Sequence, residues 1–144
     1  MKAPELMIGD WVMFTDPTNG NKRPVRLKSI NANSCCGIEG KLLLSLTDNF
    51  EPIPITGEIL EKNGFEKLMD TSEETAKRLG LKPKFTGFWM LEIGDFDSVT
   101  YNPEKHLLRI KRMMGYTSDF DNLVHVHQLQ HAIHLCNIEK DIEL

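Results

Sequence analysis

The stretch LVHVHQLQHAIHLCN, residues 123–137, is the only long segment of this chain with one consistent helical stripe of apolar residues. At about 100° per residue, the stripe consists of Val126, Leu129, Ala132, Ile133 and Cys136. This spacing predicts an amphipathic helix whose apolar face needs a partner. The alternating segments 88–93 and 107–112 are the natural sheet for it to cover.

The opposite side of this helix is expected to carry three histidines, His127, His131 and His134. Imidazoles at positions i and i+4 can bind zinc or nickel together. The metalloprotease pattern requires Glu directly after the first histidine, and Gln128 stands there instead. We therefore predict no metal or other cofactor. We keep the three histidines as the candidate metal site, against the commoner interpretation of a polar face that meets solvent or another subunit.

The first 55 residues show the alternation and the turn residues of a β-rich half. We expect strands at 10–15, 23–30, 41–46 and 50–55, with turns at 16–21 and 31–40. The last segment, FEPIPI, is predicted to be an edge strand or an extended crossing segment, because its two prolines cannot donate ladder hydrogen bonds. Four or five short, closely spaced strands predict a small SH3-like β-barrel.

After residue 55 the apolar residues take helical spacing. Thr56 is expected to cap a short helix that ends at Asn63-Gly64-Phe65. Thr71 and Glu74 have the spacing of a capping box for a second helix, which ends at Gly80. Two short helices are therefore expected before the next strands.

A three-stranded antiparallel meander is predicted at 85–93, 99–102 and 107–112, followed by a loop at 115–122 and the closing helix. In this loop, Tyr116 and Phe120 are expected to reach back to the core. The fold class is therefore α+β. We expect a barrel-like subdomain at 1–55 and an α+β subdomain at 56–144, together forming one compact unit.

Composition places the chain among ordinary globular proteins. It is 40% hydrophobic and 26% charged, and no apolar run approaches the about 18 residues that a membrane helix needs. The opening MKAPELMIGDWV lacks the apolar core of a signal peptide, so we expect a cytoplasmic protein with no membrane partner. The adjacent Cys35 and Cys36 could not pair with each other without strain, and Cys136 lies on the apolar stripe, so free thiols are expected.

The formal net charge of −4 argues against wholesale binding to a phosphate backbone, but two predicted strands carry local basic residues. These residues are Lys22, Arg23, Arg26 and Lys28 on the first, and Lys105, Arg109, Lys111 and Arg112 on the second. If Arg26, Lys28, Arg109 and Lys111 share one face, they form a candidate nucleic-acid-binding surface. A solvated strand face is the simpler interpretation.

The large aromatic residues of the predicted strands, Trp11, Trp89 and Tyr101, raise the question of an exposed binding platform. Aromatic side chains in strands usually belong to the core. We therefore expect these three residues to support the fold.

Three segments carry a resemblance: ELMIGDWV at 5–12, EPIPITGEILEKNGF at 51–65 and VHVHQLQ at 124–130. In order and approximate spacing, the chain resembles an uncharacterised family of small bacterial and phage proteins with an ELxIGxWV opening, a central IPxTxEIL…GF segment and a closing VHQLQ helix. The resemblance implies an origin in prophages or mobile elements and no established activity. The chain departs from this pattern in its longer segment 69–86 and in His131, so a histidine site would be peculiar to this member.

No catalytic set emerges from the sequence, which contains neither a nucleophile elbow nor a P-loop. We expect a non-enzymatic accessory or interaction protein that binds a protein partner or a second copy of itself. An exposed sheet edge or the polar face of the last helix would provide the contact. Nucleic-acid binding through the basic strand face is the alternative, and a metal-dependent enzyme with a site at His127, His131 and His134 is the third hypothesis.

Overall fold

The computed structural model of the chain describes residues 6–31, 34–37, 43–45 and 47–144. The protein is mixed α+β, and its described strands form two antiparallel five-stranded sheets. The residues group into two compact units. Unit 1 comprises Met1–Ile55, His125–Ile142 and Leu144, and unit 2 comprises Thr56–Val124 and Glu143.

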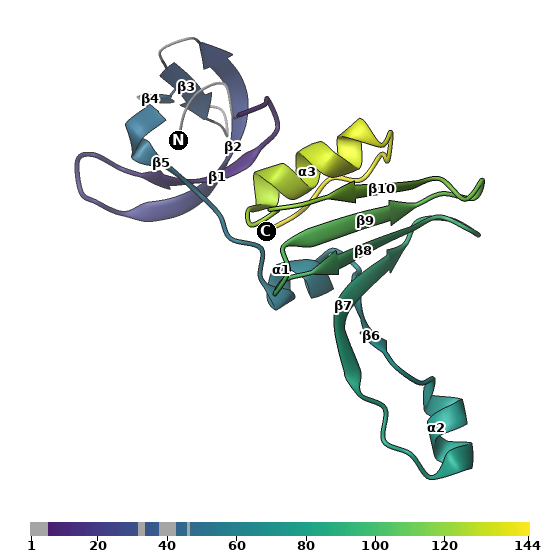
Figure 1. Cartoon of the computed structure of the whole chain (residues 1–144). Helices are drawn as coiled ribbons and strands as arrows, with labels where there is room; N and C mark the ends of the chain where they lie inside the picture. The colour runs from purple at the N-terminus through teal and green to yellow at the C-terminus, as the bar shows by residue number, and fades with distance from the viewer. Residues whose placement is uncertain (1–5, 32–33, 38–42, 46) are drawn as a thin grey trace. The chain divides into compact units, whose positions relative to one another are not determined.

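The sheet of unit 1 is built from β1 (Trp11–Thr15), β2 (Lys22–Asn31), β3 (Ser34–Gly37), β4 (Leu43–Ser45) and β5 (Phe50–Pro52). Its strand order is β4-β3-β2-β1-β5, and the sheet is curved (Figure 1). Within the described residues, no strand pairing closes this sheet into a barrel. The proline-rich segment lies at the sheet edge as β5, which confirms that prediction.

The turn predicted at 31–40 is wrong in part, because β3 lies within it and pairs with β2 and β4. The polar and glycine-bearing sequence of this segment shows no alternation. Its extended conformation is therefore stabilised by hydrogen bonds to the two neighbouring strands. The side chains of Cys35 and Cys36, for which free thiols were predicted, lie outside the described part of the chain.

The core of unit 1 follows from alternation along β1 and β2. Val12 and Phe14 are buried on β1, and Val25 and Leu27 are buried on β2. Leu6 and Phe50 complete this cluster. At the turn between the two strands, hydrogen bonds from the Thr18 hydroxyl and N–H to Asp16 lower the pKa of the Asp16 carboxyl.

Helix α3 (Val126–Leu135) belongs to unit 1 and packs against β1. It is shorter at both ends than the predicted 123–137. Gln128 Oε1 accepts from the His125 N–H at 3.0 Å at the start of the helix, and the Val126 N–H donates to the Ile53 carbonyl at 2.9 Å. The predicted apolar stripe is buried at Val126, Leu129, Ala132 and Ile133.

The sheet of unit 2 has the order β10-β9-β8-β7-β6. Its strands are β6 (Glu66–Met69), β7 (Phe85–Glu92), β8 (Ser98–Asn102), β9 (Leu107–Lys111) and β10 (Thr117–Phe120). The predicted three-stranded meander is confirmed as β7, β8 and β9. The predicted loop at 115–122 is wrong, because β10 lies there, and Tyr116 is 73% exposed rather than folded onto the core.

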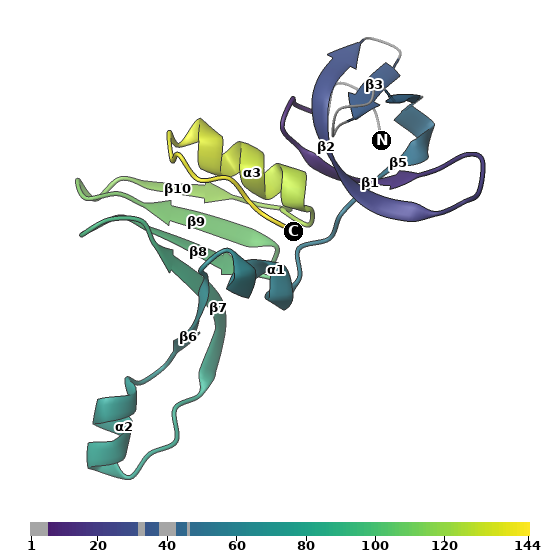
Figure 2. The same ribbon diagram turned by 180° about the vertical axis from the view of Figure 1, so that it is seen from behind.

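Two short helices complete unit 2. Thr56 caps α1 (Gly57–Lys62) as predicted, and Gly64 follows the helix with φ +80°. Helix α2 (Glu73–Leu79) is capped by Ser72 and not by Thr71, because the Ser72 hydroxyl accepts from the Thr75 N–H at 3.3 Å. The predicted left-handed cap at Gly80 is confirmed. Helix α2 lies at the far end of the β6 and β7 connection, away from the rest of the sheet (Figure 2).

Among the described residues, no helix is both long enough and apolar enough to span a membrane.

Candidate functional site

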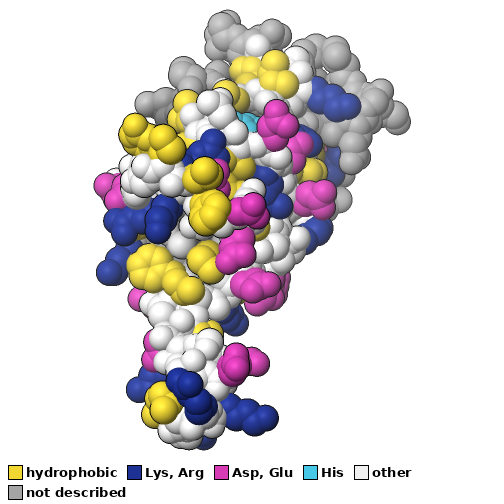
Figure 3. Space-filling model, turned by 90° about the vertical axis from the view of Figure 1, so that its right-hand side faces the viewer, with side chains coloured by type: hydrophobic (Ala, Val, Ile, Leu, Met, Phe, Trp, Pro, Cys, Tyr) yellow, Lys and Arg dark blue, Asp and Glu magenta, His cyan; other side chains and the backbone are white. Residues whose placement is uncertain are grey.

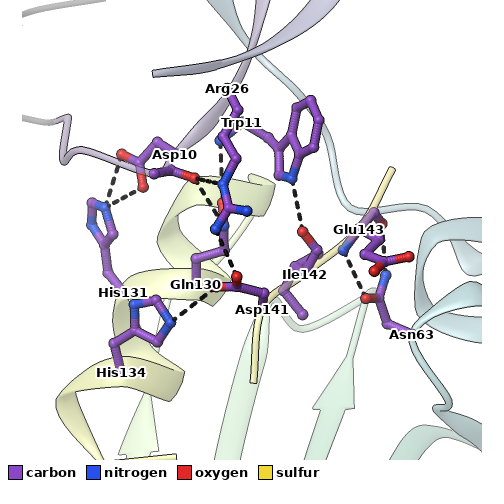
Figure 4. A network of polar contacts seen from close by, with 11 residues as sticks. Asp10, Trp11, Arg26, Asn63, Gln130, His131, His134, Asp141, Ile142 and Glu143 are labelled. Carbon is purple, nitrogen blue, oxygen red and sulfur yellow. Dashed lines mark hydrogen bonds and ion pairs between the residues drawn. The ribbon is translucent and has the colours of Figure 1, made fainter. Parts of the chain in front are cut away.

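A network of part-buried polar contacts in unit 1 joins the start of β1 to α3 (Figure 4). His131 Nε2 lies 2.9 Å from both carboxylate oxygens of Asp10, and the Met7 N–H donates to Asp10 Oδ2 at 2.7 Å. The Asp10 side chain is 3% exposed and that of His131 is 23% exposed. A buried carboxylate requires such partners, so this pair fixes the entry to β1.

Gln130, the residue before His131 on α3, continues the same network. Its Oε1 accepts from the Trp11 N–H at 3.3 Å, and its Nε2 donates to the Gly9 carbonyl at 3.4 Å. The Trp11 indole N–H donates to the Ile142 carbonyl at 2.8 Å. The start of β1 is therefore bonded both to the helix and to the segment that follows it.

Arg26 on β2 adds further contacts to this network. Its Nε donates to the Gly9 carbonyl at 2.9 Å, and one terminal nitrogen lies 2.8 Å from Asp141. His134 Nε2 is 3.8 Å from the other Asp141 oxygen. Sequence reasoning missed Asp10, Gln130 and Asp141, because each acts through a partner far away in the chain.

The three candidate metal ligands are not arranged as one site. His127 is buried, with its ring centroid 5.8 Å from that of His131 and 5.7 Å from that of His125. His131 faces Asp10, whereas His134 faces Asp141. Among the described residues, no three or more His, Cys, Asp or Glu side chains are placed to hold a metal ion.

The four candidate nucleic-acid-binding residues are divided between the two units. Arg26 and Lys28 lie on β2 of unit 1, and Arg109 and Lys111 lie on β9 of unit 2. Lys28 and Lys111 are exposed. Arg109 makes two bonds of 2.8 Å to Asp119, which raise the pKa of Arg109 and lower that of Asp119. Both arginines therefore already pair with a carboxylate.

The strand aromatics belong mainly to the cores. Trp89 and Tyr101 are buried, and Trp11 is half-buried. The Tyr101 hydroxyl donates to the Leu123 carbonyl at 2.6 Å, and burial raises the pKa of Tyr101 to about 12. These residues support the fold and do not form a binding platform.

Unit 2 instead exposes a set of apolar side chains at the two loops that join β7 to β8 and β9 to β10. This set, the tip surface, consists of Phe96, Met113, Met114 and Tyr116, which are 67 to 79% exposed. Asp97 joins the two loops, because its carboxylate pairs with Arg112 at 3.0 Å and accepts from the Met113 N–H at 2.7 Å. Figure 3 looks onto this end of the sheet and shows apolar side chains gathered beside acidic ones.

A second exposed feature of unit 2 is the arm, residues 70–84, which carries α2. Leu79 and Leu81 are 59% and 55% exposed. Four exposed cations surround them in sequence: Lys77, Arg78, Lys82 and Lys84. Figure 3 shows Lys and Arg side chains gathered around apolar atoms at the lower end of the molecule, where the arm lies.

The hollows formed by the described residues include two that each lie within one unit. One, of about 270 Å³, is lined in unit 1 by His134, Asn137, Ile138 and Glu139. The other, of about 240 Å³, is lined in unit 2 by Gly64, Glu66, Met90 and Glu92. Neither hollow is lined by the Asp10 and His131 pair, so this pair faces neither of them.

The chain matches no known protein family, no curated protein and no solved structure.

Proposed function

We propose that the chain is a non-enzymatic interaction protein that contacts a protein partner through the tip surface. The observation that carries this proposal is the grouping of four large apolar side chains, each at least 67% exposed, on two adjoining loops. Isolated exposed apolar residues are ordinary on protein surfaces, but a contiguous group marks a contact site.

The composition of the tip surface suits a protein partner. Phenylalanine, tyrosine and methionine are enriched at protein interfaces, and methionine adapts its shape to different partners. Asp97 ties the two loops together before any partner binds, and such preorganisation reduces the entropy lost on binding. The tip surface therefore combines apolar area with an ordered backbone.

The test is a paired purification from the native host. Tagged wild-type protein is compared with the double variant Phe96→Ser/Met114→Ser, and the bound proteins are quantified. The matched control is Leu135→Ser, because Leu135 on α3 is 75% exposed and lies outside the tip surface. We expect one or more proteins to be retained by wild type and by the control but lost from the tip variant. Equal recovery by all three would contradict the proposal.

Three features expected from the sequence are part of this proposal: an SH3-like barrel in unit 1, an origin in prophages or mobile elements, and a cytoplasmic location. The strand order and the curvature of the unit 1 sheet support an SH3-like barrel (Figure 2). The three resembling segments support a prophage or mobile-element origin. A cytoplasmic location belongs to the same proposal.

Nucleic-acid binding is the alternative, which the exposed cations of the arm favour more than the paired Arg26 and Arg109 do. It predicts a shift of short duplex DNA that weakens steeply with added salt. Loss of that shift on Lys82→Glu/Lys84→Glu would favour this alternative over the protein partner. Because the chain has a net charge of −4, we expect no such shift.

A further inference from the structure

The arm presents cations without counter-charges and leucines without cover. Among the described residues, none of Lys77, Arg78, Lys82 and Lys84 forms an ion pair with an acid. The two glutamates of α2, Glu73 and Glu74, lie in its first turn, at the other end from Leu79. The end of the arm is therefore both basic and apolar.

The tip surface has the complementary chemistry. Exposed Glu92 and Asp95 precede Phe96 in sequence, and neither carboxylate has an ion-pair partner among the described residues. Met113 and Met114 supply flexible thioether side chains, which can pack around leucines. Two unpaired carboxylates beside exposed methionines suit a basic segment with exposed leucines.

The placement of the two features within unit 2 allows both contacts to form at once. The arm and the tip surface lie at opposite ends of β7, because the arm precedes Phe85 and the loop with Phe96 follows Glu92 (Figures 1 and 2). A two-fold axis that sets two copies side by side, with their β7 strands running in opposite directions, would bring the arm of each copy to the tip surface of the other. Such an arrangement closes on itself and repeats each contact twice.

We propose that the partner of the tip surface is the arm of a second copy of this chain, in a reciprocal two-fold dimer. This inference rests on the proposed function, since it names the partner of the same surface. Leu79 and Leu81 pack against Phe96 and the two methionines, while the arm cations meet Glu92 and Asp95. Once the first contact forms, the second becomes intramolecular, which strengthens a pair of small contacts.

The test is sedimentation equilibrium of the purified full chain over a wide concentration range. Wild type is expected to be a dimer whose dissociation constant rises with added salt. The arm variant Leu79→Ser/Leu81→Ser and the tip variant Phe96→Ser/Met114→Ser should each be monomeric, because neither retains an intact arm together with an intact tip surface. Leu135→Ser should remain dimeric.

Mixing the arm variant with the tip variant separates this inference from simple misfolding. The mixture contains one intact arm and one intact tip surface, so it should form a mixed dimer, roughly 10²-fold or more weaker than wild type. Failure of the mixture to associate, a monomeric wild type, or a variant that stays dimeric would overturn the inference. If wild type is monomeric and the tip variant still loses a host protein in the purification, the proposed function stands and the inference alone fails.

Discussion

The carboxylate of Asp10 and the imidazole of His131 lie 2.9 Å apart, although 121 residues separate them in the sequence. The contact joins the residue before β1 to the middle of α3. Because Asp10 is buried, its charge depends on the His131 N–H and the Met7 N–H rather than on water. The pair therefore fastens the helix to the sheet of unit 1.

Removing His131 should destabilise the protein although this side chain is partly exposed. We expect His131→Ala to lower the free energy of unfolding by about 1 to 3 kcal/mol, because it leaves a buried carboxylate short of a donor. His134→Ala is the matched control. Its ring is 3.8 Å from the exposed Asp141, so its loss should change stability by under about 0.5 kcal/mol.

A double-mutant cycle checks the same pair directly. Urea unfolding of His131→Ala, Asp10→Asn and the double variant should give a coupling energy of about 0.5 to 3 kcal/mol. Additive effects of the two substitutions would show that the contact contributes nothing to stability.

Leu129 tests the buried stripe of α3. Its side chain is 0% exposed, so Leu129→Ala should lower the free energy of unfolding by about 2 to 5 kcal/mol through lost burial and a residual cavity. Leu135→Ala on the same helix removes the same atoms from a residue that is 75% exposed, and should change stability little. Similar losses for the two variants in chemical denaturation would contradict the burial of the stripe.

Tyr101 should make stability fall in alkaline solution. Its pKa is raised from 10.0 to about 12, so the folded state holds a proton that the unfolded chain releases above pH 10. The contribution of Tyr101 to the free energy of unfolding is therefore fully present below pH 10. It should decline between pH 10 and pH 12, by about 2 to 3 kcal/mol in total.

Tyr101→Phe should remove this part of the alkaline decline when unfolding is followed across that pH range. Tyr116→Phe is the control, because Tyr116 is 73% exposed, and it should retain the wild-type decline. An unchanged decline in Tyr101→Phe would assign it to other groups.

Gly57, the first residue of α1, tests the packing of Trp89. An alanine Cβ at this position would lie 3.2 Å from Trp89 Cζ2, and Trp89 is only 5% exposed. The usual gain from replacing a helical glycine should therefore be reversed, with a loss of about 1 kcal/mol or more in stability. Gly94→Ala is the comparison in thermal melts, because its Cβ would meet nothing within 4 Å.

The sequence predicted those elements that carry their own local signal. The alternation at 85–93, 99–102 and 107–112 indicated β7, β8 and β9, and Thr56 and Gly64 marked the ends of α1. Strands β6 and β10 carry the sequences EKLM and TSDF, which lack clear alternation. Their extended form is supported by pairing with β7 and β9, which a local pattern cannot show.

The candidate site was less predictable for the same reason. Helical periodicity placed His127, His131 and His134 on one polar face, yet His127 is buried and His131 meets a buried carboxylate. Whether a polar residue faces water or a distant partner depends on the tertiary fold. The tip surface was also missed, because apolar residues in turns give no periodic signal.

The discontinuity of unit 1 has a consequence for the order of events during translation. Residues 56–124 are contiguous, so unit 2 has nearly all of its chain once they have left the ribosome, whereas unit 1 must wait for 125–142. Until then, the carboxylate of Asp10 lacks its histidine and β1 lacks its helix. A released fragment that ends at residue 124 should therefore protect unit 2 from proteolysis and leave β1 and β2 open to cleavage.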